Sequence, residues 1–372
     1  MVLILNIAGY GLRLIKWFEM EHDIMKRYLN SIWTNCGRFL GMVLLLLPFV
    51  GSAHANAEEL NIYSHRQAFL IDPFLEAFTA KTGIKTNVVF AAKGLAQRLQ
   101  REGKNSPADV VLTVDIARLS VYAEKGLFTK IDSTILNNAI PSHLRDEDGH
   151  WFGLSLRSRI IGVSKDRTQE GEISSYEELA DPKWKGRICS RPGSHVYNRA
   201  LVASMIATHG EAKAEVWARG VVKNFARRPQ GNDRAQAKAI FQGECDIAII
   251  NHYYYGKMLK SEKQAQRDWA NAINIVFANQ GQDGRGAHIN ISGGGVAVHS
   301  KNKANAIKLL EFLVSDEAQM LYGKINYEYP VNPATPLAPE LKIWGDFKKD
   351  SLPISRLAEL APKAQMIIDR VG

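Results

Sequence analysis

Strand-like and helix-like segments alternate along residues 60–126. The apolar runs LNIY (60–63), KTNVVFA (85–91) and ADVVLTV (108–114) are typical of short buried strands. Between them, DPFLEAFTAKTG (72–83) and GLAQRLQREG (94–103) carry apolar residues at helical spacing and end in glycine. Strands that alternate with helices predict a parallel sheet covered by helices, and therefore an α/β fold.

The pattern begins again after a long extended segment, WFGLSLRSRIIGVS (151–164). Later apolar runs predict strands at 246–250, 273–279 and 291–300, and KANAIKLLEFLVSDEAQMLY (303–322) predicts one amphipathic helix. Two α/β units joined by a long strand predict two lobes, which suits a chain of 372 residues. The glycines at 293–295 lack the spacing of a phosphate loop, so we expect close backbone packing in a hinge strand.

The N-terminal segment has the pattern of a secretory signal. Basic residues follow Met25, an apolar run covers 39–50, and Ala55-Asn56-Ala57 fits the rule for cleavage between small residues. The run is short for a membrane span, although a retained anchor is the alternative. We therefore interpret residues 1–57 as an upstream extension with a signal peptide, and expect an exported, soluble protein that begins near Glu58.

Charge and cysteine content agree with export. The net charge of +9 comes from scattered Lys and Arg with no basic block, which argues against a nucleic-acid partner. Beyond the signal, the chain has two cysteines, Cys189 and Cys245. In an oxidising compartment an even number favours a disulfide, with two buried free thiols as the alternative.

Tyrosines follow both cysteines at the same distance. Tyr197 lies eight residues after Cys189, and Tyr253, in NHYYYG (251–256), lies eight residues after Cys245. If the cysteines lie on neighbouring parallel strands, Tyr197, Tyr253 and Tyr254 emerge at one carboxyl edge, where α/β sheets bind ligands. A surface aromatic cluster is the simpler alternative.

Converging phenols suit a hard, highly charged cation. A phenol has a pKa near 10, but a trivalent metal can displace its proton. Phenolate oxygen favours iron(III) over softer metals. Amides near Ser194, at the start of the helix that carries Tyr197, could hold an anion that completes the coordination.

The chain resembles the periplasmic ferric-iron-binding proteins of bacterial ABC importers, a transferrin-like branch of the two-lobed solute-binding proteins. The resemblance covers nearly all of the mature chain and rests on four segments: NIYSHRQ (61–67), DPKWKGRICSRPGSHVYNRAL (181–201), GECDIAIINHYYYGK (243–257) and GRGAHINISGGGVAV (284–298). It implies a type II periplasmic-binding fold whose lobes enclose iron(III). By motif, Tyr253 and Tyr254 are the adjacent ligands, Tyr197 is the third, and Tyr255 is structural.

The first lobe departs from the family. Relatives often have His and Tyr where this chain has Gln67 and Ala68, and others have a tyrosine at the position of His65. His65 is therefore the candidate first-lobe ligand, with a loop histidine as the alternative. Arg66, Arg157 and Arg159 are candidates for holding a synergistic anion such as carbonate, or for offsetting phenolate charge.

The resemblance also implies the partners and the domain limits. We expect lobe 1 to comprise 58–157 with 296–326, and lobe 2 to comprise 158–295 with 327–372. A monomeric periplasmic protein would deliver iron to an inner-membrane ABC permease and its ATPase. The same fold could instead bind a polyamine, thiamine or a phosphonate in an aromatic box. A third hypothesis, an enzyme with a tyrosine as acid or base, lacks support because no His-Asp-Ser set or nucleotide loop is evident.

Overall fold

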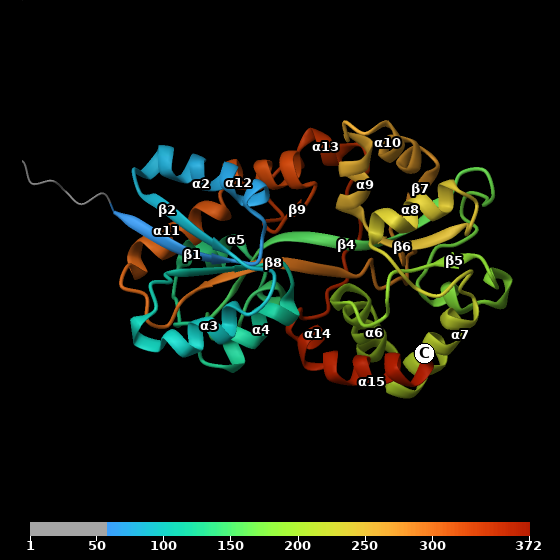
Figure 1. Ribbon diagram of the computed structural model, residues 1–372, viewed down its shortest axis with the longest axis horizontal. Coiled ribbons are helices and arrows are strands. Elements are labelled where there is room, and N and C mark those ends of the chain that lie inside the picture. Colours follow the sequence, from blue (N-terminus) through green and yellow to red (C-terminus); the bar gives the residue numbers. More distant parts are fainter. Residues whose placement is uncertain (1–57) are drawn as a thin grey trace, which may run out of the picture. The chain divides into compact units, whose positions relative to one another are not determined.

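The computed structural model describes residues 58–372, and the predicted signal segment (1–57) lies outside this range. Strands of the described part form one mixed sheet with the order β2-β1-β3-β8-β4-β6-β5, and β7 and β9 both pair with β4. Helices cover both faces of this sheet (Figure 1). Within residues 58–372, no helix is both long and apolar enough to cross a membrane.

The first half of the sheet has the predicted parallel core. Its strands are β1 (Glu59–Ser64), β2 (Lys85–Phe90) and β3 (Val110–Thr113), and β1 runs parallel to both neighbours. Its covering helices are α2 (Ala68–Thr82), α3 (Leu95–Glu102), α4 (Ile116–Glu124) and α5 (Thr134–Ala139). Helix α2 ends as the sequence predicts, because Gly83 adopts φ 75° and its N–H donates to the carbonyl of Thr79.

The second half repeats this design. Strands β5 (Ile188–Cys189) and β6 (Ile247–Asn251) are parallel, and β7 (Ile273–Val276) lies on the other side of β4. The helices are α6 (Val196–His209), α7 (Glu211–Lys223), α8 (Asp233–Phe241), α9 (His252–Leu259) and α10 (Gln264–Asn271). A disulfide joins Cys189 to Cys245 with a Cα–Cα distance of 5.9 Å, which confirms the predicted bridge.

Two long strands join the halves. Strand β4 (Phe152–Ser164) pairs with β8 (Ile289–Val296) and β9 (Tyr329–Pro330) up to Ser158, and with β6 and β7 from Arg159 onward. All of these pairings are antiparallel, as is the pairing of β3 with β8. The sheet is therefore parallel in the core of each half and antiparallel where the chain crosses between them (Figure 1).

The glycines of β8 allow close packing, as predicted. A Cβ on Gly294 would lie 2.8 Å from Leu112 Cδ2, and one on Gly295 would lie 2.6 Å from the carbonyl oxygen of His150. Real Cβ atoms do not approach other atoms so closely, so larger residues would push β8 away from its neighbours.

The predicted single helix at 303–322 is wrong in one respect, because the structure divides it. Helix α11 (Lys303–Leu313) ends before Ser315, whose hydroxyl accepts a hydrogen bond from the N–H of Ala318 and so begins α12 (Asp316–Leu321). A π-helical turn (Tyr322–Asn326) follows. The C-terminal helices are α13 (Pro339–Lys342), α14 (Ser355–Glu359) and α15 (Ala361–Val371).

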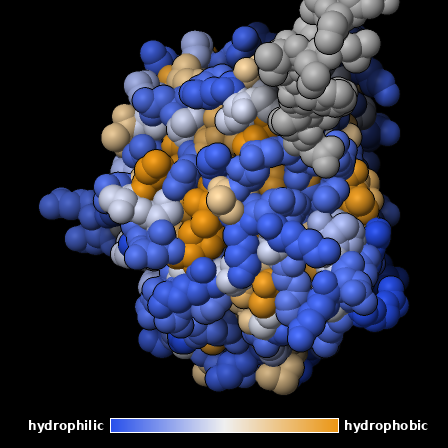
Figure 2. Space-filling view, turned by 90° about the vertical axis from the view of Figure 1, so that its left-hand side faces the viewer, coloured by the Kyte–Doolittle hydropathy of each residue, from blue (hydrophilic) through white to orange (hydrophobic). Residues whose placement is uncertain are grey.

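The core of the described part extends through both halves. Its largest fully buried side chains include Phe74 and Tyr122 in the first half and Trp184 in the second. Figure 2 shows the end of the molecule that lies at the left of Figure 1, where the surface is mainly hydrophilic and hydrophobic residues form small separate patches.

Candidate metal centre

Three predicted tyrosines meet where α6 and α9 begin. Tyr197 is the second residue of α6, and Tyr253 and Tyr254 lie in the first turn of α9. The hydroxyl of Tyr253 donates a hydrogen bond to the hydroxyl of Tyr197 over 3.0 Å, and the ring centroids of Tyr253 and Tyr254 are 4.5 Å apart. Because β5 and β6 are parallel, the segments that follow them leave the same edge of the sheet, as the sequence spacing predicts.

The tyrosines line a pocket of about 260 Å³ between the two halves. Its lining residues come from the loop after β1, the start of α2, the residue after β3, strand β4, helices α6, α8 and α9, and the residue before β9. They are His65, Arg66, Gln67, Phe69, Leu70, Val114, Arg157, Tyr197, Arg234, Tyr253, Tyr254, Lys257 and Glu328. A particle in this pocket can therefore contact both halves of the sheet at once.

Tyr253 and Tyr254 resist deprotonation because they are buried. Burial raises the pKa of Tyr253 well above its usual value, and the neighbouring phenols of Tyr197 and Tyr254 raise it further. Burial likewise raises the pKa of Tyr254 to about 12. A cation that binds through these oxygens must displace their protons, which only a highly charged ion does at neutral pH.

Guanidinium groups surround the phenol rings. The Cζ atoms of Arg157 and Arg159 both lie 5.8 Å from the centroid of the Tyr197 ring, and that of Arg191 lies 5.1 Å away. Arg234 lies 4.9 Å from the ring of Tyr254. Positive charge at these distances stabilises phenolate.

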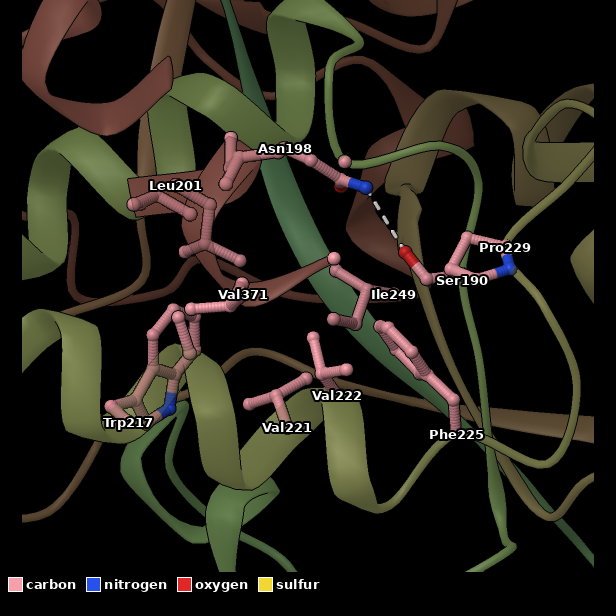
Figure 3. A pocket seen from close by; sticks show the side chains of 15 residues that line it. Ser190, Asn198, Leu201, Trp217, Val221, Val222, Phe225, Pro229, Ile249 and Val371 are labelled. Carbon is pink, nitrogen blue, oxygen red and sulfur yellow. Dashed lines mark hydrogen bonds between the residues drawn. The ribbon is translucent and has the colours of Figure 1, made fainter. Parts of the chain in front are cut away.

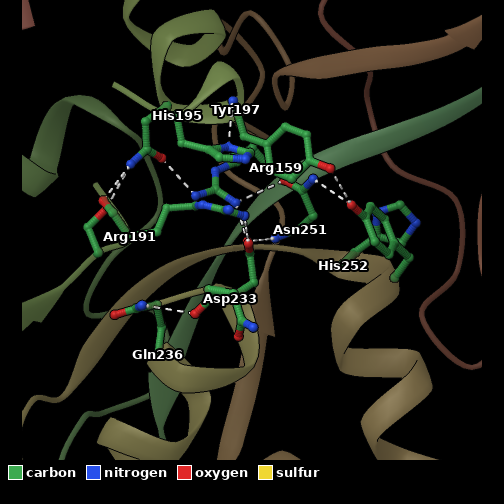
Figure 4. A network of polar contacts seen from close by, with 12 residues as sticks. Arg159, Arg191, His195, Tyr197, Asp233, Gln236, Asn251 and His252 are labelled. Atoms are coloured by element: carbon green, nitrogen blue, oxygen red, sulfur yellow. Dashed lines mark hydrogen bonds and ion pairs between the residues drawn. The ribbon is translucent and has the colours of Figure 1, made fainter. Parts of the chain in front are cut away.

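Asp233 organises this positive charge (Figure 4). It is fully buried at the start of α8, and its carboxylate accepts hydrogen bonds from Arg159 and Arg191. The backbone N–H of Asn251 donates to the same carboxylate over 2.9 Å. Burial alone would raise the pKa of Asp233, but the two guanidiniums outweigh burial and lower it.

Hydrogen bonds connect Asp233 to the tyrosines. Arg159 Nη1 donates to Asn251 Oδ1 over 3.0 Å, and Asn251 Nδ2 lies 3.3 Å from the hydroxyl of Tyr253. Arg159 Nη2 donates to Asn198 Oδ1 over 2.7 Å. The terminal nitrogens of Arg159 are thus engaged in orienting the site and are not available to hold a synergistic anion in the iron pocket.

Arg66 and Arg157 line the pocket as candidates for anion binding. Arg66 Nη2 forms a buried ion pair with Glu328 at 2.9 Å, and its buried Nη1 has no partner within residues 58–372. Arg157 donates to the hydroxyl of Ser292 over 3.1 Å and to the carbonyl of Ile291 over 2.7 Å. Arg66 therefore retains a free donor group.

His65 lies in the pocket wall, but its ring nitrogens are both engaged. Nδ1 lies 2.8 Å from the carbonyl oxygen of Ala91, and Nε2 lies 2.8 Å from the hydroxyl of Tyr122. Since a carbonyl can only accept, Nδ1 carries the proton and Nε2 accepts from Tyr122. Burial, aided by Arg118, lowers the pKa of His65, so the ring is neutral. The structure brings His65 near the tyrosines without a free lone pair.

Ser194, Tyr255 and His252 do not line the tyrosine pocket. Ser194 is exposed, and His195 rather than Ser194 caps α6 by accepting from the N–H of Tyr197 over 3.3 Å. Tyr255 packs against Trp344 with ring centroids 5.9 Å apart, in keeping with its predicted structural role. His252 points away from the phenols, and its Nε2 lies 2.7 Å from the carbonyl oxygen of Tyr327.

A separate apolar cavity of about 70 Å³ lies between α6, α7 and α15. Figure 3 shows its wall, which includes Leu201, Trp217, Phe225 and Ile249. Asn198 and Ser190 form its polar side, with Asn198 Nδ2 donating to Ser190 Oγ over 3.0 Å. This cavity lacks the converging oxygen atoms of the tyrosine pocket and does not suit a metal ion.

Sequence reasoning missed Asp233 and Glu328, which hold the guanidiniums in place. The pair Asn232-Asp233 has the pattern of a helix start, but nothing in the sequence links it to Arg159, 74 residues earlier. Glu328 lies 262 residues from Arg66 and follows a π-helical turn that the sequence did not predict.

Comparisons with known proteins agree on one family. Residues 105–349 match the family described as bacterial extracellular solute-binding protein. The chain is 44% identical to iron uptake protein A1 of Synechocystis sp. over 85% of this chain and 87% of that protein. Among solved structures, the chain is similar to the Trichodesmium protein IdiA (FutA), which was solved in complex with iron and citrate ligands. The TM-score is 0.81, and the sequences are 45% identical over 84% of this chain and 99% of that one.

A second solved structure is equally similar. Ferric iron-binding protein A of Mannheimia haemolytica, in an open conformation, has a TM-score of 0.80 and 46% identity over 85% of this chain and 98% of that one.

Proposed function

This chain belongs to the bacterial extracellular solute-binding proteins, and from this membership we propose that it binds iron(III) between its two lobes and delivers it to an ABC permease. Its two-lobed α/β architecture is that of the type II periplasmic binding proteins, as the sequence predicts. The relatives named above are iron uptake and ferric iron-binding proteins, which supports iron(III) as the ligand.

One contact carries the proposal. The hydroxyls of Tyr253 and Tyr197 lie 3.0 Å apart, beside the N-terminal ends of α9 and α6. With Tyr254 beside Tyr253, these phenols supply three hard oxygen donors that together neutralise the charge of iron(III) once deprotonated. Burial raises the pKa of Tyr253 and of Tyr254, and the nearby charges of Arg157 and Arg191, respectively, oppose that rise. The three tyrosines thus hold the metal, and the arginines lower the cost of removing their protons.

A small anion completes the coordination in this proposal. The unpartnered Nη1 of Arg66 and the guanidinium of Arg157 lie in the pocket wall, and carbonate has the planar shape that matches them. The citrate in the Trichodesmium structure is likewise a carboxylate bound with iron. His65 remains a candidate ligand, but it can coordinate only if the hydrogen bond from Tyr122 to its Nε2 breaks.

Strand pairing supports the proposed lobes and refines them. Strand β4 pairs with β8 and β9 up to Ser158 and with β6 and β7 from Arg159 onward. This change of pairing partners agrees with a lobe 1 that ends at residue 157. Strand β8 pairs with β3 and the first part of β4, so we place the return crossing before Ile289 rather than at residue 296. Iron held by both lobes would favour their closed arrangement.

The family also supports the cellular setting. Solute-binding proteins of this kind work outside the inner membrane, so we place the mature protein in the periplasm as a monomer that serves a permease and its ATPase. We propose no catalytic activity, because the converging groups are metal ligands and their supports. An organic ligand in an aromatic box is less suitable, since the rings of Tyr253 and Tyr254 are 4.5 Å apart and leave no room for a stacked ligand between them.

Titration of the iron-free protein with iron(III) tests the proposal. Tyrosinate bound to iron(III) should give a visible charge-transfer band that saturates at one iron per chain. Gallium(III), a hard trivalent ion without partly filled d orbitals, should bind and displace iron without producing the band. Tight binding of thiamine or a polyamine with no coloured iron complex would instead establish the organic-ligand alternative.

A further inference from the structure

A second, smaller cavity lies beside the ring of Tyr197. It measures about 10 Å³ and is lined by Arg157, Arg159, Tyr197, Asn251, His288 and Asn290. A cavity of roughly 10–15 Å³ accommodates one water-sized particle, so this cavity holds at most a single small particle. Tyr197 and Arg157 also line the larger pocket, so the small cavity lies next to the proposed iron site but is distinct from it.

Three buried donor atoms of the lining residues have no hydrogen-bond partner within residues 58–372. They are Arg157 Nε, Arg159 Nε and Asn290 Nδ2. The three side chains are almost completely buried, with exposed fractions of 3%, 2% and 6%. A buried donor left without an acceptor destabilises the folded state, more strongly when the group is charged, so the site favours a particle that accepts hydrogen bonds.

Two acceptor oxygens in the cavity wall are already used. Asn290 Oδ1 accepts from the backbone N–H groups of Ile116 and Ile291, and Asn251 Oδ1 accepts from Arg159. A water molecule would have to donate as well as accept, whereas an anion only accepts.

The charge around the cavity is positive. Arg159 and Arg191 share the single carboxylate of Asp233, and Arg157 forms no ion pair in the described part of the chain. His288 adds no charge, because burial, followed by the charges of Arg285 and Arg159, lowers its pKa to about 3. Two guanidiniums with free Nε–H groups beside a neutral imidazole make the cavity electrostatically suited to a negative particle.

We propose that this cavity binds one monatomic anion of the size of chloride, held by Arg157 Nε, Arg159 Nε and Asn290 Nδ2. The anion acts as the buried counter-ion of Arg157 and so stabilises this part of β4, next to Tyr197. It is separate from the carbonate proposed for the iron pocket, because the two anions occupy different cavities.

Bromide tests the site in the iron-free protein. Crystals soaked in bromide should show an anomalous-scattering peak in this cavity, within hydrogen-bonding reach of the three donors. In solution, replacing gluconate by chloride at constant ionic strength should raise the melting temperature, since a ligand that binds the folded state stabilises it by mass action. Neither measurement involves iron, so the result is independent of the proposed iron function.

Asn290→Asp supplies the matched variant. The variant keeps the side-chain oxygen that accepts from Ile116 and Ile291, and it replaces the Nδ2 donor by a negatively charged oxygen. Halide binding should therefore weaken at least about tenfold, which corresponds to about 1.4 kcal/mol. The melting temperature of this variant should no longer depend on chloride. Asn271→Asp, on the exposed end of α10, should respond to chloride as the unmodified protein does.

Two results would overturn the proposal. One is a bromide-soaked crystal with water and no anomalous peak in the cavity, a test that needs no variant. The other is the same chloride dependence of the melting temperature in Asn290→Asp and in the unmodified protein.

Discussion

The hydroxyl of Tyr253 donates a hydrogen bond to the hydroxyl of Tyr197 across 56 residues of sequence. The disulfide between Cys189 and Cys245 spans the same number of residues. Each tyrosine lies eight residues after its cysteine. Strand β5 ends at Cys189 and Cys245 lies just before β6, so the bridge ties these two parallel strands together, and the segments beyond them bring the two phenols to the same edge of the sheet.

Removal of single hydroxyls tests the ligand set. Tyr197→Phe, Tyr253→Phe and Tyr254→Phe should each weaken iron(III) binding by more than about 100-fold, because loss of an outer-shell partner alone costs about 10- to 100-fold. Each variant should also shift or bleach the visible band. Competition with a chelator gives the affinity, and absorption spectroscopy gives the band.

Tyr255→Phe is the matched control for these variants. It removes the same atom one residue further along α9, where the ring packs against Trp344. Its affinity and colour should equal those of the unmodified protein. If Tyr253→Phe and Tyr254→Phe behave like this control, the phenols are not metal ligands.

Asp233→Asn should destabilise the protein strongly. The substitution keeps the shape but leaves Arg159 and Arg191 buried without the carboxylate that they share. Breaking a buried ion pair by removal of one partner costs about 3–5 kcal/mol. Urea unfolding, monitored by circular dichroism, measures the change.

The exposed Asp283 provides the comparison, since Asp283→Asn on the surface should change the unfolding free energy by less than about 0.5 kcal/mol. A similarly small effect for Asp233→Asn would mean that the guanidiniums do not depend on this carboxylate.

The disulfide should contribute substantially to stability. It closes a loop of 56 residues, for which the chain-entropy relation gives about 4 kcal/mol. The double variant Cys189→Ala with Cys245→Ala should lose about this amount in guanidinium unfolding. Reduction should lower the stability of the unmodified protein and leave that of the double variant unchanged. Free alkylation of both thiols in the native protein would contradict the bridge.

The convergence of the tyrosines was predictable because its causes are local. A helix begins seven residues after each cysteine, α6 after Cys189 and α9 after Cys245, so knowledge that β5 and β6 are adjacent and parallel suffices to bring Tyr197 and Tyr253 together. The close packing of the glycines in β8 was likewise predictable, because three successive residues without side chains in a strand favour near approach of other chain segments.

The supporting charges were not predictable, because they depend on contacts between distant segments. Asp233 and Arg159 belong to segments that the pairing of β4 with β6 brings together, and Glu328 precedes β9, which pairs with β4. The interpretation of His65 as a ligand followed from its place in the motif, whereas its bond to Tyr122 depends on the packing of α4. The break at Ser315 was missed because its apolar neighbours continue the helical spacing.

Glu328 should make stability dependent on acid pH. Burial alone would raise the pKa of Glu328, but the charge of Arg66, followed by that of Arg157, outweighs burial and lowers it to about 2, against 4.5 for an ordinary glutamate. A carboxyl group whose pKa is lower in the folded state stabilises the protein above the unfolded pKa. This stabilisation disappears as the pH falls through the folded pKa.

The variant Glu328→Gln isolates this effect. Its unfolding free energy should be lower than that of the unmodified protein near neutral pH by on the order of 3 kcal/mol, since one pKa unit corresponds to about 1.4 kcal/mol. The difference should shrink between about pH 5 and pH 2, because protonated Glu328 resembles glutamine. Urea unfolding of both proteins across this range measures the difference in unfolding free energy, and the contributions of other carboxyl groups cancel in it.

Glu317→Gln, which removes an exposed ion pair with Lys81, is the control, and its unfolding free energy should differ from that of the unmodified protein by less than about 1 kcal/mol. A constant difference between pH 7 and pH 2 would show that the ion pair with Arg66 does not hold Glu328 charged.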